Sequence, residues 1–276
     1  MHSFVRSVPQ EITQKQTMST TTETTQETVT ENQNDKPYRI QTTAGHRKYL
    51  CSGLYLPSVT TVLSGTESEK SKAGLRNWQA NNPGMLEQAA TRGTAVHLAC
   101  ENYLRGLDPA IPDEYQSFFN GMDQYLNWFD TLHWSERPLR PDWNHLRSED
   151  REVAYVWSTK HLYAGCPDLI GEIGGVKVIA DFKTSNGPYM NRFPEKGDRA
   201  GFGGFRKYQK TAQQMAAYRV ALEERTGFRC DVALIIVATE ETTQGIFIDG
   251  DQLDLYESRF LKRCEQFHTM YPDNEN

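Results

Sequence analysis

The stretch from Tyr163 to Ser185 carries acidic and basic residues at positions where they could act on one substrate group. Asp168 opens an apolar run, and Asp181 and Lys183 lie at the end of a second run. Because side chains alternate along a strand, Asp181 and Lys183 would share one face, with Phe182 on the other. Two carboxylates suit a hard divalent cation such as Mg²⁺ or Mn²⁺. The lysine could hold or deprotonate a water molecule, or stabilise charge that develops on a phosphate.

A β-hairpin is the element that would bring these residues together. The two apolar runs, 168–173 and 176–183, are rich in β-branched residues and are joined by Gly174-Gly175. A glycine pair between two such runs is typical of a hairpin turn. Pairing of the strands could then place Asp168 close to Asp181. The alternative is a Pro-Asp turn followed by a solvent-exposed strand end, and these residues alone leave both interpretations open.

Two further candidates come from other elements. His97 lies on the apolar face of an amphipathic helix predicted over 86–104. A histidine on such a face is more often a core residue than a ligand. Glu152 precedes a predicted strand over 153–158 that would lead into the hairpin, so its carboxylate could reach the same site. A surface charge at the start of a strand is the alternative interpretation.

The remaining chain predicts a small hairpin, several helices and two more strands. Pro57 and Ser58 are placed to open a helix. In a long helix stopped by Gly227, Gln214 and Tyr218 are four residues apart and so share a face. The predicted ranges are hairpin 38–55, helices 56–63, 71–81, 113–131, 208–226 and 251–271, connector 132–150, and strands 230–239 and 245–248.

A basic segment precedes the long helix. Between Arg192 and Lys210 six basic residues face two acidic ones, which gives a local charge of +4, among glycines and two phenylalanines. We interpret it as a flexible basic loop that suits phosphates and unstacked bases, with Arg206 and Lys207 among its cations. A solvated surface loop is the alternative. The net charge of −6 and pI near 5.7 of the whole chain do not favour nucleic-acid binding.

Composition bounds the class of protein. The 276 residues are 37% hydrophobic, enough for a core, and residues 1–36 form a polar, Thr-rich segment that predicts a disordered tail. Met18 is an alternative start. We expect one domain over 37–276, with a helical part at about 56–131 and a sheet core at about 150–276. No 18-residue apolar run or secretory signal is present. The five scattered cysteines indicate a reducing compartment.

Five motifs in order resemble the RecB-type branch of the PD-(D/E)xK nuclease superfamily. They are Arg92-Gly93-Thr94, the helical His97 that follows it, the Gly165-Cys166-Pro167-Asp168 strand start, Asp181-Phe182-Lys183-Thr184, and the spaced pair Gln214 and Tyr218. Within that branch, Pro57-Ser58-Val59-Thr60 and the compact length are most similar to the mitochondrial genome maintenance exonucleases and related phage exonucleases. The resemblance covers about residues 55–271.

The resemblance implies an α/β (α+β) fold with a restriction-endonuclease-like core, in which a central mixed β-sheet is flanked by helices. It implies a metal-dependent deoxyribonuclease that hydrolyses phosphodiester bonds from free ends of single-stranded DNA. Asp168, Asp181 and Lys183 would be catalytic, and Mg²⁺ or Mn²⁺ would bind His97, Asp168, Asp181 and the Phe182 carbonyl. Glu152, placed before its predicted strand, is a further candidate metal ligand. The residues expected to contact or support DNA are Thr184, Ser185, Arg206, Lys207, Lys210, Gln214 and Tyr218.

The same resemblance limits cofactors and partners. Many relatives hold an iron–sulfur cluster on four cysteines, but Cys230 and Cys264 lack the required spacing, so we expect no cluster. No GxxxxGK[ST] motif is present, so we expect no nucleotide cofactor. Replication or recombination proteins are the expected protein partners, and we expect the cytoplasm, that of a host for a viral chain, over the mitochondrial matrix. The alternatives are a structure-specific endonuclease, a catalytically silent DNA-binding or interaction protein, and an unrelated α/β protein.

Overall fold

A computed structural model describes residues 36–41, 47–148 and 153–272 of the chain. The chain divides into two units, residues 1–31 and 32–276, and all described residues belong to the second. The predicted tail, the choice between Met1 and Met18, and the candidate Glu152 lie outside the described residues. None of the described helices is long and apolar enough to cross a membrane.

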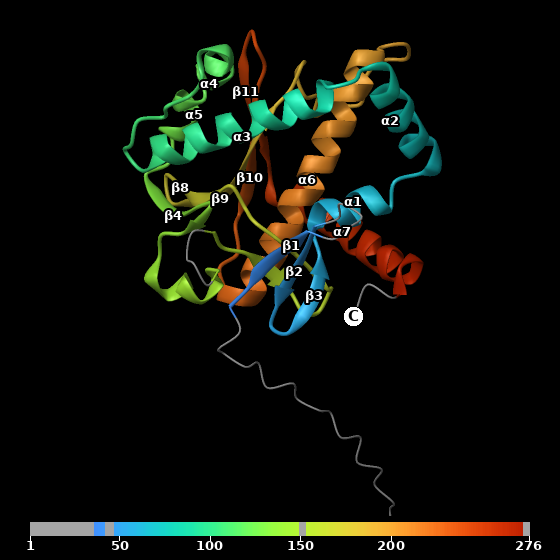
Figure 1. Ribbon diagram of the computed structural model, residues 1–276. Helices are drawn as coiled ribbons and strands as arrows, with labels where there is room; N and C mark the ends of the chain where they lie inside the picture. Colours follow the sequence, from blue (N-terminus) through green and yellow to red (C-terminus); the bar gives the residue numbers. More distant parts are fainter. Residues whose placement is uncertain (1–35, 42–46, 149–152, 273–276) are drawn as a thin grey trace, which may run out of the picture. The chain divides into compact units, whose positions relative to one another are not determined.

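A six-stranded mixed sheet forms the centre of the fold, in the order β11-β10-β9-β8-β4-β5 (Figure 1). The predicted hairpin is confirmed: β8 and β9 pair antiparallel, and the register Leu169↔Ala180 places Asp168 beside Asp181. β10 pairs parallel with β9, and the other neighbours are antiparallel. The strands are β4 Thr131–Ser135, β5 Arg137–Pro138, β8 Leu169–Ile173, β9 Val176–Thr184, β10 Val232–Ala238 and β11 Thr243–Ile248.

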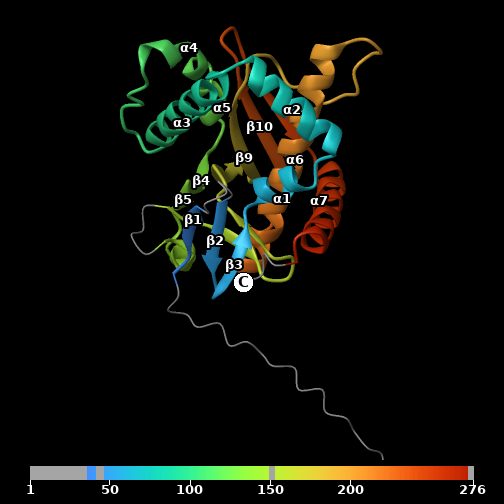
Figure 2. The same cartoon turned by 45° about the vertical axis from the view of Figure 1, so that its right-hand side comes forward.

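Helices cover both faces of this sheet, which confirms the expected mixed sheet flanked by helices (Figure 2). Alternate residues of β10 enter two separate cores, as the period of two along a strand requires. Ile235 packs on the side of α6 and α7, and Leu234 and Ile236 pack on the side of α3, α4 and α5. These helices are α3 Met85–Leu104, α4 Gln116–Phe119, α5 Asp123–Leu126, α6 Arg199–Thr226 and α7 Gly250–Met270.

The N-terminal part and the segment before β8 form two small sheets. β1 Tyr38–Gln41, β2 Arg47–Cys51 and β3 Leu54–Pro57 make three antiparallel strands where we expected one hairpin. Ser58 caps α1, Val59–Gly65, as predicted, and α2 follows at Glu69–Asn81. The predicted strand 153–158 is shorter, β6 Val156–Ser158, and pairs with β7 Tyr163–Gly165 in its own sheet. It therefore does not extend into the central hairpin.

The predicted helix 113–131 is wrong. The segment instead contains a 3₁₀ turn at Asp113–Tyr115, then α4 and α5, and its last residue begins β4. Gly121, with a φ of +88°, interrupts the helix between α4 and α5. The predicted connector 132–150 is also partly structured, because β4 pairs with β8 at Leu132↔Gly171, and a second 3₁₀ segment spans Pro141–Leu146.

The predicted flexible basic loop is largely helix. α6 begins at Arg199, so Arg206, Lys207 and Lys210 lie on its first turns and not in a loop. Asp198 caps the helix through a 2.7 Å hydrogen bond from the Gly201 amide. Two of the glycines that suggested flexibility, Gly201 and Gly204, serve close packing: a Cβ at Gly204 would lie 2.6 Å from the Pro188 carbonyl oxygen. The basic side chains therefore project from a helix and not from a loop.

Candidate functional site

The β8–β9 hairpin brings the two predicted aspartates and the lysine to the same end of the sheet. Asp168 precedes β8, and its Oδ2 accepts a 2.7 Å hydrogen bond from the Phe182 amide. Asp181 and Lys183 are ion-paired on the same strand, as side-chain alternation predicts. Phe182 points to the other side, into the core under α3. Asp168 and Asp181 are both buried, with 7% and 1% of their surface exposed, so their charges are poorly hydrated.

His97 reaches this site from α3. Its Nε2 lies 2.8 Å from the Phe182 carbonyl oxygen, which can only accept, so Nε2 carries a proton. Its Nδ1 lies 3.6 Å from Asp168 Oδ2 and also 3.6 Å from Glu136 Oε1. The ligand atoms of His97, Glu136 and Asp168 all lie within 4.8 Å of one another. We call these three residues with Asp181 and Lys183 the site cluster.

Glu136 is the member of the site cluster that sequence reasoning missed. It lies in the turn between β4 and β5, where its φ of 55° is unusual for a residue with a Cβ. Its amide donates a 2.8 Å hydrogen bond to the Asp168 carbonyl oxygen, which joins the turn to the start of β8. The segment had been predicted as a connector, so the sequence offered no local signal that this carboxylate would lie beside Asp168.

The pair Gln214 and Tyr218 on α6 supports the site cluster from the other face. Gln214 Nε2 donates to Asp181 Oδ1 at 3.1 Å and to the Tyr218 hydroxyl at 3.2 Å. Tyr218 is buried, and its ring packs so closely on Gly165 that a Cβ there would lie 2.3 Å from Tyr218 Cε1. Gly165 therefore belongs to the motif because only a glycine leaves room for the tyrosine that orients Gln214.

Burial and mutual repulsion shape the charges of the site cluster. Burial raises the pKa of Asp181 to about 6, against the opposing effect of Lys183, and it also raises the pKa of Asp168. Burial alone would lower the pKa of His97, but Asp168 and Glu136 raise it to about 9. Asp181 and Asp168 likewise outweigh the burial of Lys183 and raise its pKa. The carboxylates are therefore held in a place that disfavours their ionised form unless positive charge is close.

The predicted DNA-contacting residues extend from the end of β9 onto α6. Ser185 is buried, and its Oγ accepts a 2.9 Å hydrogen bond from Lys207 Nζ. Thr184 lies under α3, 3.8 Å from where a Cβ on Gly93 would stand. Arg206, the residue before Lys207 in α6, donates to Ser71 Oγ of α2 at 2.8 Å. A basic surface thus begins directly beside the site cluster.

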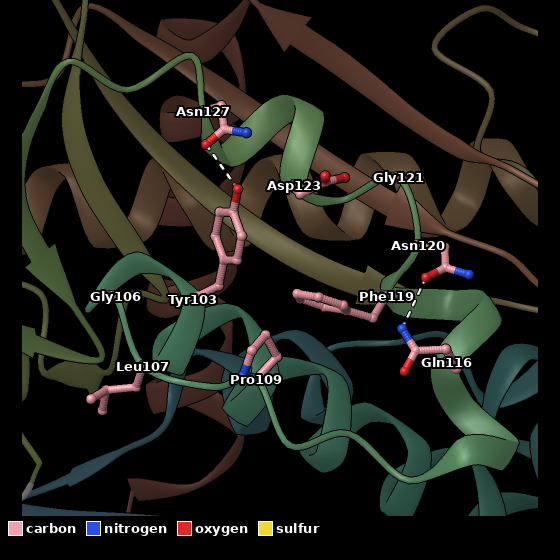
Figure 3. Close-up of a pocket in the computed structure, with 10 residues that line it drawn as sticks. All are labelled: Tyr103, Gly106, Leu107, Pro109, Gln116, Phe119, Asn120, Gly121, Asp123 and Asn127. Atoms are coloured by element: carbon pink, nitrogen blue, oxygen red, sulfur yellow. Dashed lines mark hydrogen bonds between the residues drawn. The ribbon is translucent and has the colours of Figure 1, made fainter.

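A separate pocket of about 680 Å³ lies between the end of α3 and the segment with α4 and α5 (Figure 3). Tyr103 donates to Asn127 across it at 3.0 Å, and Gln116 donates to Asn120 at 2.9 Å. Its lining consists of amide, apolar and aromatic side chains with a single carboxylate, that of Asp123. No residue of the site cluster lines it, so this pocket is not part of the candidate site.

No protein-family model matches the chain. No curated protein matches it either. Among solved structures, it is similar to a protein called SSO0001, with 16% identity over 39% of this chain and a TM-score of 0.25, and it spans 41% of that protein. It is also similar to a protein from Eubacterium rectale, provisionally described as an exonuclease, with 12% identity, 64% of this chain and 68% of that chain covered, and a TM-score of 0.34. Both similarities are too distant to place the chain in a family.

Proposed function

We propose that the protein is a metal-dependent deoxyribonuclease that hydrolyses phosphodiester bonds, from free ends of single-stranded DNA. The observation that carries the proposal is the convergence of His97, Glu136 and Asp168 beside the Asp181–Lys183 ion pair. At one end of the sheet, these residues offer ligands for a hard cation next to the ammonium group of Lys183. The resemblance of the motifs to RecB-type PD-(D/E)xK nucleases supports DNA as the substrate.

The residues present fit a divalent cation. Carboxylate oxygens with one imidazole nitrogen are a donor set that Mg²⁺ and, better, Mn²⁺ accept. Burial raises the pKa values of Asp168 and Asp181, so a cation bound beside them would favour their ionised forms. His97 Nδ1, Asp168 and Glu136 would hold the ion, and Asp181 and the Phe182 carbonyl are further expected ligands. When bound, such an ion polarises the phosphoryl oxygen and stabilises charge in the transition state.

Lys183 acts by its charge. Its pKa is raised by Asp181 and Asp168, so at neutral pH it is an ammonium and a hydrogen-bond donor. It therefore orients the attacking water or contacts a non-bridging phosphate oxygen, and the alternative role of a proton acceptor is disfavoured. Gln214 fixes the Asp181 carboxylate, and the buried Tyr218 fixes Gln214. These two residues of α6 would therefore hold the Asp181 carboxylate in position for the reaction.

The proposal is tested with end-labelled linear single-stranded DNA and closed single-stranded circles, each incubated with Mg²⁺, with Mn²⁺ and with EDTA. We expect metal-dependent loss of the linear strand alone. Cleavage of the circles as well would replace the exonuclease by an endonuclease on the same site. Binding without cleavage of either substrate, in both metals, would contradict the enzyme proposal and favour a catalytically silent DNA-binding protein.

A further inference from the structure

Helix α2 is unlike the other long helices because it buries none of its side chains. A surface helix in a globular protein normally packs an apolar stripe against the core. In α2 the apolar side chains are instead open to solvent, with 54% of Leu75 and 42% of Trp78 exposed. Packing against the core therefore does not explain why α2 carries these two apolar side chains, and an exposed apolar surface of this kind is typical of a binding site.

Figures 1 and 2 show α2 near the end of α6 at which that helix begins. Residues of both helices line a groove of about 880 Å³. Its α2 wall presents Leu75 and Trp78 together with cations, and its α6 wall presents further cations, while Glu67 supplies the acidic group. The basic residues that line it are Lys70, Lys72, Arg76, Arg206, Lys207 and Lys210. One side of the groove thus combines a flat apolar ring with positive charge, and the other side is positive.

The groove leads to the site cluster. Lys207 lines the groove and also donates to Ser185 Oγ, two residues beyond Lys183. At the other side, Arg206 donates to Ser71 of α2 and lies 3.6 Å from Glu67. A chain lying in the groove would therefore pass from α2, over α6, to the end of β9.

The cations on the α6 wall are not fully neutralised by the protein. Burial lowers the pKa of Lys207, and the nearby Arg92 lowers it further. Burial also lowers the pKa of Lys210, where Glu67 opposes the effect and Arg263 and Arg206 add to it. A polyanion in the groove would favour the charged forms of both lysines.

We propose that the groove between α2 and α6 binds one unpaired nucleic-acid strand, with a base stacked on Trp78 and phosphates on the facing cations. The inference rests on the proposed function for the identity of the strand as a substrate. The turns from Lys70 to Trp78 span about 12 Å, room for about three or four nucleotides at about 3.4 Å each. An acidic peptide would match the charge but has no flat face for the indole, and a duplex keeps its bases stacked on one another.

Binding in EDTA separates this proposal from catalysis. Fluorescence anisotropy of labelled dT oligomers, from two to ten nucleotides long, should show affinity that rises steeply up to about four nucleotides. Trp78→Ala should weaken binding about 5- to 100-fold, and Trp78→Phe, which keeps an aromatic face, should restore most of it. Trp128→Ala, which removes an exposed tryptophan that stacks on Phe247 and does not line the groove, should change nothing.

An abasic oligomer of the same length and charge tests the stacking itself. Without a base, the strand should bind the wild type as weakly as dT binds Trp78→Ala, and Trp78→Ala should cause no further loss. Equal losses for Trp78→Ala on dT and abasic strands would overturn the stacking. Lys70→Ala and Arg76→Ala should each reduce the slope of log affinity against log salt by about 0.7. Lys160→Ala, which removes an exposed cation outside the groove, should leave the slope unchanged.

Competition decides between the ligand classes. Poly-glutamate that displaces the dT oligomer as well as unlabelled dT does, at equal charge, would overturn the proposal in favour of an acidic peptide. Trp78-dependent binding without metal-dependent cleavage would contradict the proposed function and leave the groove assignment standing. Metal-dependent cleavage with no loss of affinity in Trp78→Ala would contradict the groove assignment and leave the proposed function standing.

Discussion

Helix α6 touches two charge networks that differ in what they do. Near its middle, Gln214 supports the site cluster through Asp181. One turn further, Arg219 is almost fully buried and pairs with Asp254 and Glu257 of α7, which also contact Arg229. We call Arg219, Arg229, Asp254 and Glu257 the α6–α7 network. Both groups border the core on the α6 side of the sheet, and in both an acidic side chain is in direct contact with a basic one.

The carboxylates of the two groups respond to their surroundings in opposite directions. Hydrogen bonding from Arg219 lowers the pKa of Asp254, so the folded protein favours its ionised form. Burial raises the pKa of Asp181 to about 6 and raises that of Asp168, so the folded protein disfavours theirs. Asp254 still reaches solvent, with 59% of its side chain exposed, whereas Asp181 does not.

The difference teaches how to tell a structural ion pair from a reactive one. A permanently charged guanidinium with partly hydrated carboxylates satisfies the α6–α7 network without any ligand. The site cluster contains three carboxylates around one imidazole and one ammonium, and its acids remain unfavourably placed. Such uncompensated groups are typical of functional sites, because a ligand supplies the missing charge. The presence of acids and bases in direct contact would not have separated the two groups.

The largest expected effect is on catalysis. Asp168→Asn keeps an acceptor for the Phe182 amide but removes a charge from the site cluster. We expect the rate of single-strand cleavage to fall about a thousandfold or more, equivalent to about 4 kcal/mol of transition-state stabilisation. The measurement is the single-turnover rate on end-labelled DNA in Mn²⁺. Arg219→Met is the control, and it should keep the wild-type rate per folded molecule; cleavage by Asp168→Asn at a comparable rate would remove Asp168 from the reaction.

The next largest effect is on folding stability, and here Arg219→Met, the control for catalysis, is the test variant. Arg219→Met keeps most of the aliphatic volume but leaves Asp254 and Glu257 without their buried partner. We expect the free energy of unfolding to fall by about 3 kcal/mol, at the low end for a broken buried pair because Asp254 is partly hydrated. Urea denaturation followed by circular dichroism measures it. A loss below about 1 kcal/mol would mean that the α6–α7 network is no more stabilising than surface ion pairs.

A third effect, slightly smaller, is stabilisation by metal. A cation that binds only the folded protein raises the unfolding free energy by about 2.7 kcal/mol at 100 times its dissociation constant. Thermal denaturation with Mn²⁺ and with EDTA should show this gain in wild type and in Arg219→Met. Asp168→Asn should show none at the same concentration. An equal gain in Asp168→Asn would place the cation somewhere other than the site cluster.

Much of the fold could be predicted because its signals are local. Gly174-Gly175 between two apolar runs specified the β8–β9 hairpin, and that hairpin alone brings Asp168 beside Asp181. The helices α3 and α7 and strand β10 also lie close to their predicted ranges, since periodicity and length define them within one segment. His97 was predicted as a candidate for the same reason, because its position on α3 follows from the helical period.

The errors occur where distant residues decide. β4 is short, and its pairing with β8 and β5 makes it a strand, so its sequence was predicted to be part of a helix and a connector. The first turns of α6 contain glycines that suggested a loop, but one of them, Gly204, lets the helix pack on the Pro188 carbonyl. Glu136 was missed for the first of these reasons. Its place beside Asp168 depends on the β4–β8 pairing, which the sequence does not announce.

Glu136 also provides the finest test of the comparison. Its substitution decides whether a cation in the site cluster is held by Glu136 together with His97 and Asp168, or lies between Asp168 and Asp181. Glu136 Oε1 lies 3.6 Å from His97 Nδ1, on the side of the imidazole opposite the Phe182 carbonyl. We expect Glu136→Gln to weaken Mn²⁺ binding about tenfold, measured by electron paramagnetic resonance titration, because one anionic ligand becomes neutral. Glu101→Gln makes the same change one turn beyond His97 on α3, where Glu101 pairs with Arg105, and should leave the affinity unchanged. Wild-type affinity in Glu136→Gln would mean that the cation binds between Asp168 and Asp181 and that Glu136 only holds His97 in place.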